Sequence, residues 1–434
     1  MASTTIAEIS RLDLQDLSTP PVASITGVKH LSSYNWIEAP TPTIAVPGSP
    51  PLWSAPRFPR QLKKDSGLIY IAQNAARHPE SPLEPLFRAL YIANPLFDIR
   101  SIDVVTDRNN IRKLLSFINP GSTRNGLETF TINIEVTKNT AIFSREETAT
   151  HEFIGPHEFR GFGHEFEKVY TTSQISGSTG HHRIISYRFG DLSFIVRHET
   201  DGYVDADTRI PSSNSKEPEN DSLSSMLGSL SLSPTNRPPN TTPNTTLAGS
   251  KLTIKGEGRV VPIGSTLEIK TRVFHKPLKI QEVAPQLWVS QTPKLVRAYH
   301  HKGTFQGPEI EDVAAEIRRW EGGNQRDLRK LAALISKILN VVKGCGGNAI
   351  VKYDEKRDKL VVRKVDRKKM LPKDLYSKWD DKDNSEAETN TDHDAGAESA
   401  VKPVDGVETK ADGKSIVFGR GDTKGKRESA ATCQ

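Results

Sequence analysis

The chain has 434 residues, 35% of them hydrophobic, and a mean hydropathy of −0.51, so part of its length is expected in tails or linkers rather than in a packed core. Two cysteines are too few for a disulfide framework or a cysteine-based zinc site. A net charge of +6 is weak evidence for a polyanionic partner. The lack of any long apolar stretch predicts a protein that does not enter a membrane, and we expect it inside the cell, in the nucleus or cytoplasm.

The first half of the chain predicts a tail followed by the beginning of a mixed domain. Residues 1–30 have the composition of a flexible tail, and residues 31–60, rich in proline with interspersed aromatics, predict an extended strap lying on the domain. Periodicity predicts three further elements, which are a helix at 108–118, a hairpin at 129–144 and a helix at 161–171. Residues 31–207 are therefore expected to form the first part of one domain.

The second half predicts an insertion, the rest of the domain, and a C-terminal region. Residues 208–250, dense in Ser, Pro, Asn and Thr, cannot bury a core and predict a disordered insertion. Residues 251–308 are expected to complete the domain, residues 309–379 to form the C-terminal region, and residues 380–434 to be a disordered tail. The predicted elements are a strand pattern at 251–274, a helix at 279–291, a strand at 294–299, amphipathic helices at 309–320 and 325–342, and short strands near 348–353 and 359–364.

The C-terminal region also carries a charge excess. Residues 351–378 hold eleven Lys and Arg against five Asp and Glu, a surplus of six that equals the net charge of the whole chain. A phosphate-facing surface, a nuclear-import patch and an ordinary solvated basic face all agree with this composition.

Acidic side chains recur at regular places in the strand patterns. Side chains at i and i+2 of a strand share a face, so Glu199 and Asp201 at the end of one apolar strand should point together, as should Glu268 and Lys270 in a later strand. The opposite face of each strand is apolar, and Glu167 lies on a predicted helix. If the two strands are neighbours, up to four carboxylates and one ammonium converge.

Such a cluster predicts a divalent-metal site. Adjacent carboxylates repel each other and take up protons unless a countercharge is present, and Mg²⁺ or Mn²⁺ prefers oxygen ligands of this kind. Metal ions can activate water and clamp a phosphoryl group, and Lys270 would hold or polarise the attacking water. E-x-K and E-x-D are also common on solvated strand faces, so the prediction depends on the ordered combination of the motifs.

The order of these motifs resembles that of the DXO family of decapping exoribonucleases, whose signature runs G-Φ-x-x-Φ-E, E-Φ-D, E-Φ-K and a helical Gln. Here the motifs stand as Gly163 to Glu167, Glu199-Thr200-Asp201, Glu268-Ile269-Lys270 and Gln291. The sequence VVTDRNNIRKLL is similar to the family's W-R-G-x-x-T-K-L-L helix, which puts Arg108 and Lys113 on its arginine and lysine. The resemblance covers roughly residues 60–310.

The resemblance implies an α+β fold, with a mixed β-sheet core flanked by helices as in PD-(D/E)xK nucleases. It implies a site for two divalent ions, Mg²⁺ or Mn²⁺. Their four ligands would be Glu167, Asp201, Glu268 and the carbonyl of Ile269. Glu199 would act mainly through bound water and, with Lys270 and Gln291, would be catalytic, whereas Arg108 and Lys113 would bind the substrate. The implied reactions are decapping, including NAD-cap removal, pyrophosphate release and 5′→3′ trimming. The implied partners are RNA 5′ ends and a 5′→3′ exoribonuclease.

Departures from the family pattern leave alternatives open. Asp107 and Asn109 replace the tryptophan and glycine beside the family's arginine, and Asp107 could weaken phosphate binding by Arg108. Thr200 replaces an apolar residue. The leading hypothesis is an enzyme, a hydrolase of phosphoric ester or anhydride bonds of RNA. The alternatives are a catalytically weak or inactive RNA-binding or scaffold relative, and a nuclease that prefers DNA.

Overall fold

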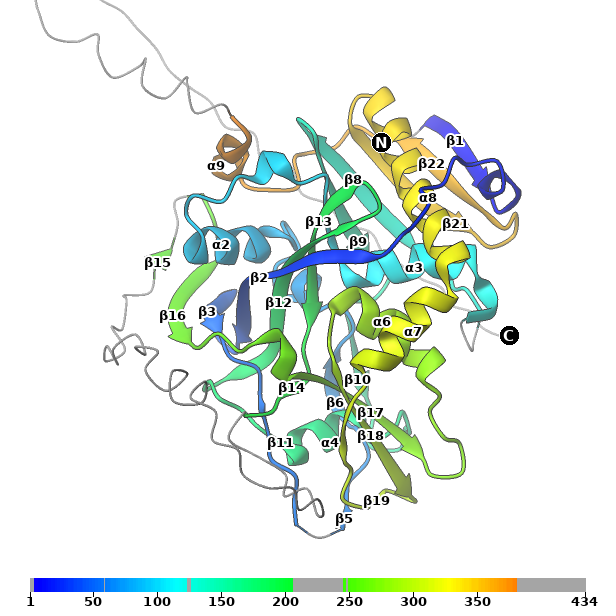
Figure 1. Cartoon of the computed structure of the whole chain (residues 1–434). Helices are drawn as coiled ribbons and strands as arrows, with labels where there is room; N and C mark the ends of the chain where they lie inside the picture. Colours follow the sequence, from blue (N-terminus) through cyan, green and yellow to red (C-terminus); the bar gives the residue numbers. More distant parts are fainter. Residues whose placement is uncertain (1–3, 58, 123–125, 206–244, 247–248, 381–434) are drawn as a thin grey trace, which may run out of the picture. The chain divides into compact units, whose positions relative to one another are not determined.

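A computed structural model describes residues 4–57, 59–122, 126–205, 245–246 and 249–380. Most of the predicted insertion at 208–250, and the predicted tail at 380–434 apart from Asp380, lie outside the described residues. The described chain has a mixed α+β architecture, which confirms the predicted fold class (Figure 1). None of its helices is both long and apolar enough to cross a bilayer.

The larger of the two main sheets has twelve strands. Their order is β1-β22-β21-β8-β9-β7-β13-β12-β2-β3-β16-β15, and three pairs are parallel, namely β13 with β7, β7 with β9 and β3 with β16. In chain order the strands are β1 (Thr4–Ser10), β2 (Ile25–Ile37), β3 (Thr43–Gly48), β7 (Val104–Asp107), β8 (Thr131–Thr137), β9 (Thr140–Glu146), β12 (Ser178–Phe189), β13 (Leu192–Glu199), β15 (Thr245–Thr246), β16 (Thr253–Gly258), β21 (Asn348–Asp354) and β22 (Lys359–Lys364).

A second sheet and a two-stranded ribbon complete the β-structure. The second sheet runs β11-β4-β14-β17-β18-β19-β5, and β20 pairs with the first residues of β18. Two of its pairs are parallel, β4 with β14 and β17 with β18, and a helix joins β17 to β18. Its strands are β4 (Leu52–Trp53), β5 (Arg60–Gln61), β11 (Thr171–Thr172), β14 (Gly202–Tyr203), β17 (Thr266–Val273), β18 (Lys294–His301), β19 (Thr304–Phe305) and β20 (Ile310–Asp312). The ribbon pairs β6 (Gly67–Tyr70) with β10 (His151–Ile154).

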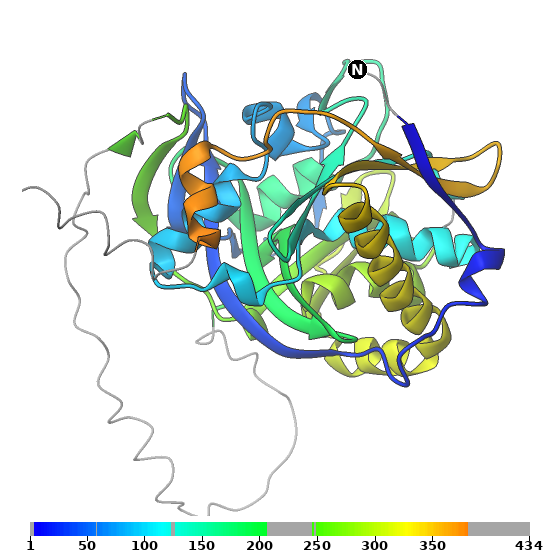
Figure 2. The same ribbon diagram turned by 90° about the horizontal axis from the view of Figure 1, so that it is seen from above.

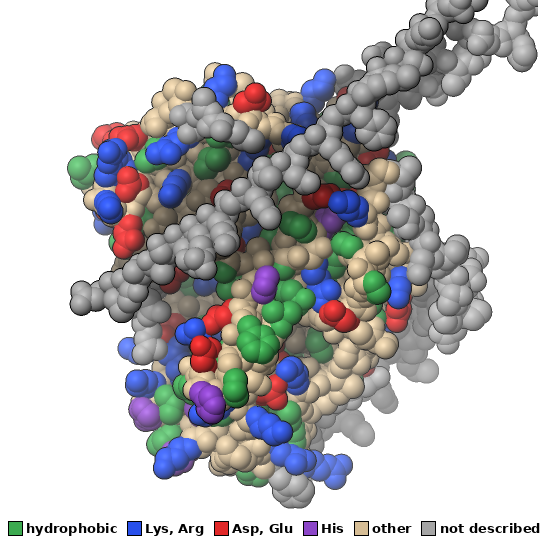
Figure 3. Space-filling view, turned by 180° about the vertical axis from the view of Figure 1, so that it is seen from behind, with side chains coloured by type: hydrophobic (Ala, Val, Ile, Leu, Met, Phe, Trp, Pro, Cys, Tyr) green, Lys and Arg blue, Asp and Glu red, His purple; other side chains and the backbone are tan. Residues whose placement is uncertain are grey.

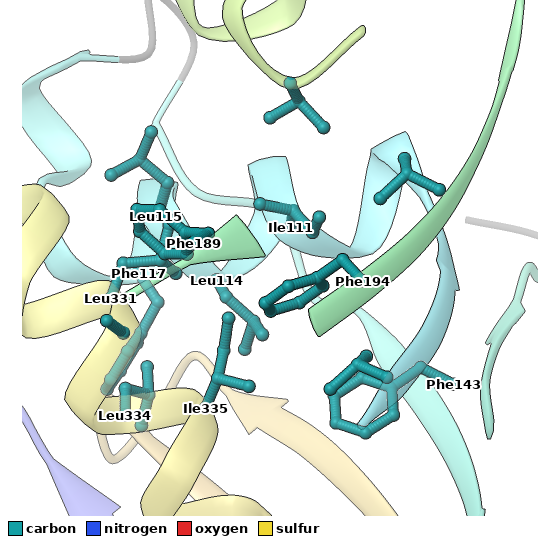
Figure 4. Close-up of a cluster of buried hydrophobic side chains, with 14 of the residues drawn as sticks. Ile111, Leu114, Leu115, Phe117, Phe143, Phe189, Phe194, Leu331, Leu334 and Ile335 are labelled. Carbon is teal, nitrogen blue, oxygen red and sulfur yellow. The ribbon is translucent and has the colours of Figure 1, made fainter. Parts of the chain in front are cut away.

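Helices cover both faces of the large sheet (Figure 2). They are α1 (Gln73–Arg77), α2 (Glu84–Ala93), α3 (Arg108–Ile118), α4 (Gly163–Tyr170), α6 (Ile280–Ser290), α7 (Ala314–Gly323), α8 (Gln325–Gly344) and α9 (Lys373–Tyr376). On one face, α3, α6 and α8 pack with side chains such as Phe194 and Val196 of β13, and Figure 4 shows the part of this core between α3 and α8. On the other face, α2 packs over Ile195 of the same strand.

Most predicted elements are confirmed near their expected bounds. The helix expected at 108–118 is α3, the hairpin is β8–β9, and the strand–helix–strand run is β17–α6–β18. In β13, however, the face that carries Glu199 is not open as expected, because Ile195 and Arg197 on that face are also buried. A central strand of a sheet covered on both sides buries both sets of side chains, so only the end of β13 is free to carry function.

The two ends of the described chain differ from the prediction. Residues 4–10, assigned by composition to a flexible tail, form β1, which pairs with β22 and buries Ile9 in the main core. Residues 31–48 are extended as expected, but they are paired inside the sheet as β2 and β3 rather than laid over it. The C-terminal helices and strands belong to the same core, since Leu331 and Leu334 of α8 pack with Phe117 of α3. Composition could not reveal the pairing of β1 or the packing of α8, because their partners are more than 200 residues away.

Candidate metal centre and basic hollows

The predicted acidic residues meet where the two main sheets join. After β13 the chain leaves the large sheet at Thr200 and enters the second sheet as β14, whose Gly202 lies opposite Leu267 of β17. Beyond that pair the edge of β17 is open, and the carboxylate of Asp201 accepts the N–H of Ile269 at 2.8 Å. Asp201 is therefore held at the strand that carries Glu268 and Lys270, as the sequence predicted.

Helix α4 adds Glu167 to this junction. The helix is fixed by Phe166 and Tyr170, whose buried rings stack with centroids 3.9 Å apart, and by Asp65, which accepts the N–H of Glu165 at 3.0 Å. Glu167 projects into the same hollow as Glu199 and Asp201. The structure thus brings all four predicted carboxyl groups close enough for their charges to act on one another, since, besides burial, the charges of Asp201, Glu199 and Glu268 all raise the pKa of Glu167.

Glu268 is the most tightly bound of the four carboxylates. Its side chain is 2% exposed and accepts hydrogen bonds from Lys270 at 2.5 Å, from Arg108 at 3.2 Å and from Gln286. Burial alone would raise the pKa of Glu268, but the charges and hydrogen bonds of Lys270 and Arg108 outweigh it and lower the pKa to about 2. Glu268 is therefore ionised at every physiological pH.

Glu167 and Asp201 are in the opposite condition. Burial, followed by the charges of Asp201 and Glu199, raises the pKa of Glu167 well above its usual range. Burial and the charge of Glu268 raise the pKa of Asp201 to about 8. Both carboxyls are short of positive charge, because Lys270 and Arg108 are already engaged with Glu268.

Glu199 and Lys270 complete the cluster. The side chain of Glu199 is exposed to the hollow, but the protein around the hollow partly desolvates its carboxyl and raises its pKa. Burial would lower the pKa of Lys270, but the charges of Glu268 and Asp201 outweigh it and raise the pKa, so Lys270 remains an ammonium.

The donor set suits a hard divalent cation, although its present arrangement is not a ready-made ligand cage. All the donors are carboxylate or carbonyl oxygens, which Mg²⁺ and Mn²⁺ prefer, and two of the carboxyls lack a countercharge. Across the described residues no three His, Cys, Asp or Glu side chains stand close enough to hold a metal ion as they are. To become a ligand, Glu268 would have to give up its contact with Arg108 at Oε2, whereas Lys270 and Gln286 can keep their contacts at Oε1.

Three hollows surround the cluster. The largest, ≈ 780 Å³, contains Glu167, Glu199 and Asp201. A hollow of ≈ 250 Å³ on the other side of Glu199 is basic, and a third of ≈ 590 Å³ contains Lys270. The basic hollow is lined by three arginines that face it from α3 and β9, namely Arg108, Arg112 and Arg145. Glu199 borders the first two hollows and Arg112 the last two, so carboxylates and guanidinium groups lie along one connected surface.

The two predicted substrate residues lie on α3 in different surroundings. Arg108 is at the first turn of the helix and reaches Glu268, whereas Lys113 faces the third hollow, with its ammonium 3.7 Å from Glu128. Asp107 does not compete with the phosphate-binding role predicted for Arg108, because its carboxylate is bound by the buried Arg197 at 2.7 and 3.0 Å. The unusual residue beside Arg108 is thus neutralised by a partner 90 positions along the chain.

Gln291 is not placed with the carboxylates, and another glutamine occupies that position. Gln291 ends α6 in the left-handed conformation, with φ 54°, and its amide donates to the Trp288 carbonyl at 2.5 Å. Gln286, five residues earlier on the same helix, donates to Glu268. A helical glutamine has no fixed spacing in the motif, so the sequence could not choose between the two.

Two further side chains were missed by sequence reasoning. Arg112 lies one turn after Arg108 on α3 and borders two of the hollows, a position that the helical spacing i, i+4 could have indicated. Gln73 borders Glu199 near Gly180, where an added Cβ would lie 2.5 Å from Gln73 Oε1 and 3.1 Å from Glu199 Oε1. No sequence signal marks Gln73, because the long-range pairing of β12 brings it there.

A family model described as a domain of unknown function, DUF8563, matches residues 5–379. No curated protein matches the chain.

Solved structures of Rai1 proteins share the fold. A mutant of S. pombe Rai1 in complex with 3′-FADP is 12% identical, with a TM-score of 0.50 over 84% of this chain and 100% of that one. Candida albicans Rai1 in complex with pU5-Mn²⁺ is 10% identical, with a TM-score of 0.52 over 87% and 99%. Scheffersomyces stipitis Rai1 in complex with (3′-NADP)⁺ and calcium ion is 11% identical, with a TM-score of 0.52 over 87% and 97%. The predicted resemblance to the DXO family is therefore confirmed for the fold.

Proposed function

We propose that this chain, which belongs to the DUF8563 family, is a metal-dependent hydrolase acting on the 5′ ends of RNA. The observation that carries the proposal is the meeting of Glu167, Asp201 and Glu268 at the open edge of β17, beside a hollow lined by arginines. The fold agrees with it, since the Rai1 structures of the same fold were solved with RNA, dinucleotide or metal ligands.

Glu167, Asp201, Glu268 and the Ile269 carbonyl are the residues that would hold Mg²⁺ or Mn²⁺. In an extended strand the N–H and C=O of one residue point to the same edge, so the Ile269 carbonyl faces the edge where its N–H meets Asp201. When bound, the metal supplies positive charge for the phosphoryl oxygens and an activated water.

Lys270 and Glu199 have complementary parts in this scheme. Lys270 stays protonated, so it acts as a fixed cation that orients water or offsets charge on the phosphoryl oxygens, and not as a proton acceptor. Glu199 faces the hollow without a role in holding Glu268, so it can accept a hydrogen bond from a water in front of the phosphorus. Gln286, rather than Gln291, takes the position of the helical glutamine and orients Glu268.

The arginine-lined hollow is the proposed binding place for 5′ phosphates. Burial, followed by the charge of Arg108, lowers the pKa of Arg112 to about 10, so it remains a cation at neutral pH in a space with more arginines than acids. Guanidinium groups bind phosphates through paired N–H donors. At ≈ 250 Å³ this hollow suits phosphate groups, while the larger one beside Asp201 can take the attached nucleotide.

The test is cleavage of 5′-triphosphate, NAD-capped and 5′-monophosphate RNAs by the full chain with Mn²⁺. Metal-dependent products that disappear in Asp201→Ala and Glu268→Ala are expected. Glu165→Ala, on the same helix as Glu167 but with a side chain that does not line the hollow, should cleave like the original chain. Matched DNA oligonucleotides show whether the sugar matters, since a preference for RNA requires contacts to the 2′-OH.

One observation favours a second function, RNA binding without strong catalysis. Both carboxylate oxygens of Glu268 already accept hydrogen bonds, and the contact of Oε2 with Arg108 opposes metal binding. RNA binding that is unchanged in Asp201→Ala, with no product from any 5′ end, would support a binding or scaffold protein. A 5′→3′ exoribonuclease partner and a place in the nucleus or cytoplasm remain predictions of the resemblance.

A further inference from the structure

The ribbon β6–β10 stands apart from the two main sheets and carries an exposed apolar pair. Within the described residues β6 and β10 pair only with each other. In their register Phe153 lies directly opposite Leu68, so the two side chains share one face of the ribbon. They are 71% and 53% exposed, which is unusual for a cross-strand pair of large apolar residues.

Other apolar side chains are exposed in the same part of the chain. The described residues expose eleven large hydrophobic side chains, and five of them lie on the ribbon, in the segments directly after its strands, or on α4. These five are Leu68, Ile71, Phe153, Phe159 and Val169. In the space-filling view from behind, hydrophobic side chains gather on the lower half of the molecule among charged ones (Figure 3). The ribbon, the segments after its strands and α4 therefore carry almost half of the large apolar side chains that the described residues expose.

The ribbon forms a wall of the hollow that contains the acidic cluster. Leu68, Ile69 and Tyr70 of β6 line this hollow together with Glu167 and Asp201. The guanidinium of Arg77 lies over the Tyr70 ring, 4.9 Å from its centre, and so covers one face of this ring. Because Leu68 lines the hollow and Phe153 is its cross-strand partner, this apolar pair lies at one edge of the hollow.

We propose that Phe153, supported by Leu68, is a stacking platform for an unpaired nucleobase. The base would belong to the RNA whose phosphate reaches Asp201 and Glu268, so this inference rests on the proposed function. An exposed phenyl ring is suited to a nucleobase, because every base has a flat π-face and stacking does not depend on sequence. The volume of ≈ 780 Å³ leaves room for a nucleotide between the carboxylates and the ribbon. In a duplex the bases are stacked on one another, so an unpaired nucleotide is the form that offers a base to this ring.

Binding of a labelled five-nucleotide RNA to the full chain, in EDTA so that no cleavage occurs, tests the platform. Phe153→Ala should weaken binding about tenfold, within the roughly 5- to 150-fold range expected for the loss of one stacked base. Phe153→Tyr should bind like the original chain. The control is Phe274→Ala, because Phe274 is 58% exposed but follows β17 and is not on the ribbon whose strand β6 lines the hollow.

An abasic RNA separates base stacking from other contacts. If one base stacks on Phe153, its removal weakens binding to the original chain and has no further effect on Phe153→Ala. In Phe153→Trp, the RNA with all its bases should quench the added fluorescence and the abasic RNA should not. Thermal melting confirms that each variant is folded.

Several outcomes overturn the platform. The first is that Phe153→Ala binds RNA as tightly as the original chain. The second is that removal of the base weakens binding equally in the original chain and in Phe153→Ala, and the third is that neither chain binds RNA. A protein partner on this face would also give an unchanged RNA affinity in Phe153→Ala. Base-dependent binding without any metal-dependent cleavage would support the platform while removing the proposed hydrolase activity, so the two failures are distinguishable.

Discussion

Metal binding at the acidic cluster should release protons, and Asp201 allows the effect to be calculated. With a pKa of about 8, Asp201 is ionised in roughly one chain in a hundred at pH 6 and in half of the chains at pH 8. Because the metal needs the carboxylate, its apparent affinity should increase about 50-fold over this interval. The raised pKa of Glu167 adds to the slope in the same direction.

The same pKa has a consequence for stability without metal. A buried carboxyl whose folded pKa is raised favours its protonated form, so the folded chain loses stability as pH rises from the usual value of 3.8 to about 8. At about 1.4 kcal/mol for each pH unit the full loss would be about 6 kcal/mol, an upper bound because Asp201 is partly open to the hollow. Asp201→Asn removes the titrating group, and melting in EDTA should then change much less between pH 5 and pH 8.

Two measurements check this reasoning. Calorimetric titration with Mn²⁺ in buffers of different ionisation enthalpy at pH 7 should show the release of about one proton from Asp201, together with any from Glu167. Thermal melting in EDTA gives the stability slope for the original chain and for Asp201→Asn. A Mn²⁺ affinity that is constant between pH 6 and pH 8, with no proton release, would refute the argument, as would equal melting slopes in the two chains.

Three further predictions concern α6, α3 and β1. Gln286→Ala should lower the rate of RNA cleavage about 10- to 100-fold, because it removes a hydrogen bond to a charged carboxylate. The cleavage rate of Gln291→Ala should stay within about twofold of the original, and the reverse order of the two variants would restore Gln291 as the functional residue. Arg112→Ala should raise KM for 5′-triphosphate RNA about tenfold and weaken the salt dependence of binding, and an unchanged salt dependence would show that Arg112 does not meet phosphate. Ile9→Ala should lower the free energy of unfolding by about 2–4 kcal/mol in a urea titration, since Ile9 is fully buried, and a loss below about 0.5 kcal/mol would mean that residues 4–10 are a loose tail after all.

Local sequence patterns were sufficient for most elements near the candidate site. The apolar spacing of α3 and the alternation in β8, β13 and β17 depend on neighbours within a few residues, and the structure has these elements close to the expected bounds. The i, i+2 spacing also placed Glu268 with Lys270, whose ammonium indeed reaches that carboxylate. Such features survive tertiary folding because the backbone geometry of a strand fixes them.

Pairings across long sequence distances were decided only by the tertiary structure. Gln286 rather than Gln291 meets Glu268 because of the rotation of α6 over β17, and Asp107 is neutralised by Arg197 because β7 lies beside β13. Residues 4–10 become a strand only because β22, more than 350 positions away, offers them an edge. The free energy of such contacts comes from partners that no local window contains. The sequence could therefore identify the chemistry of the cluster but could not choose every residue that completes it.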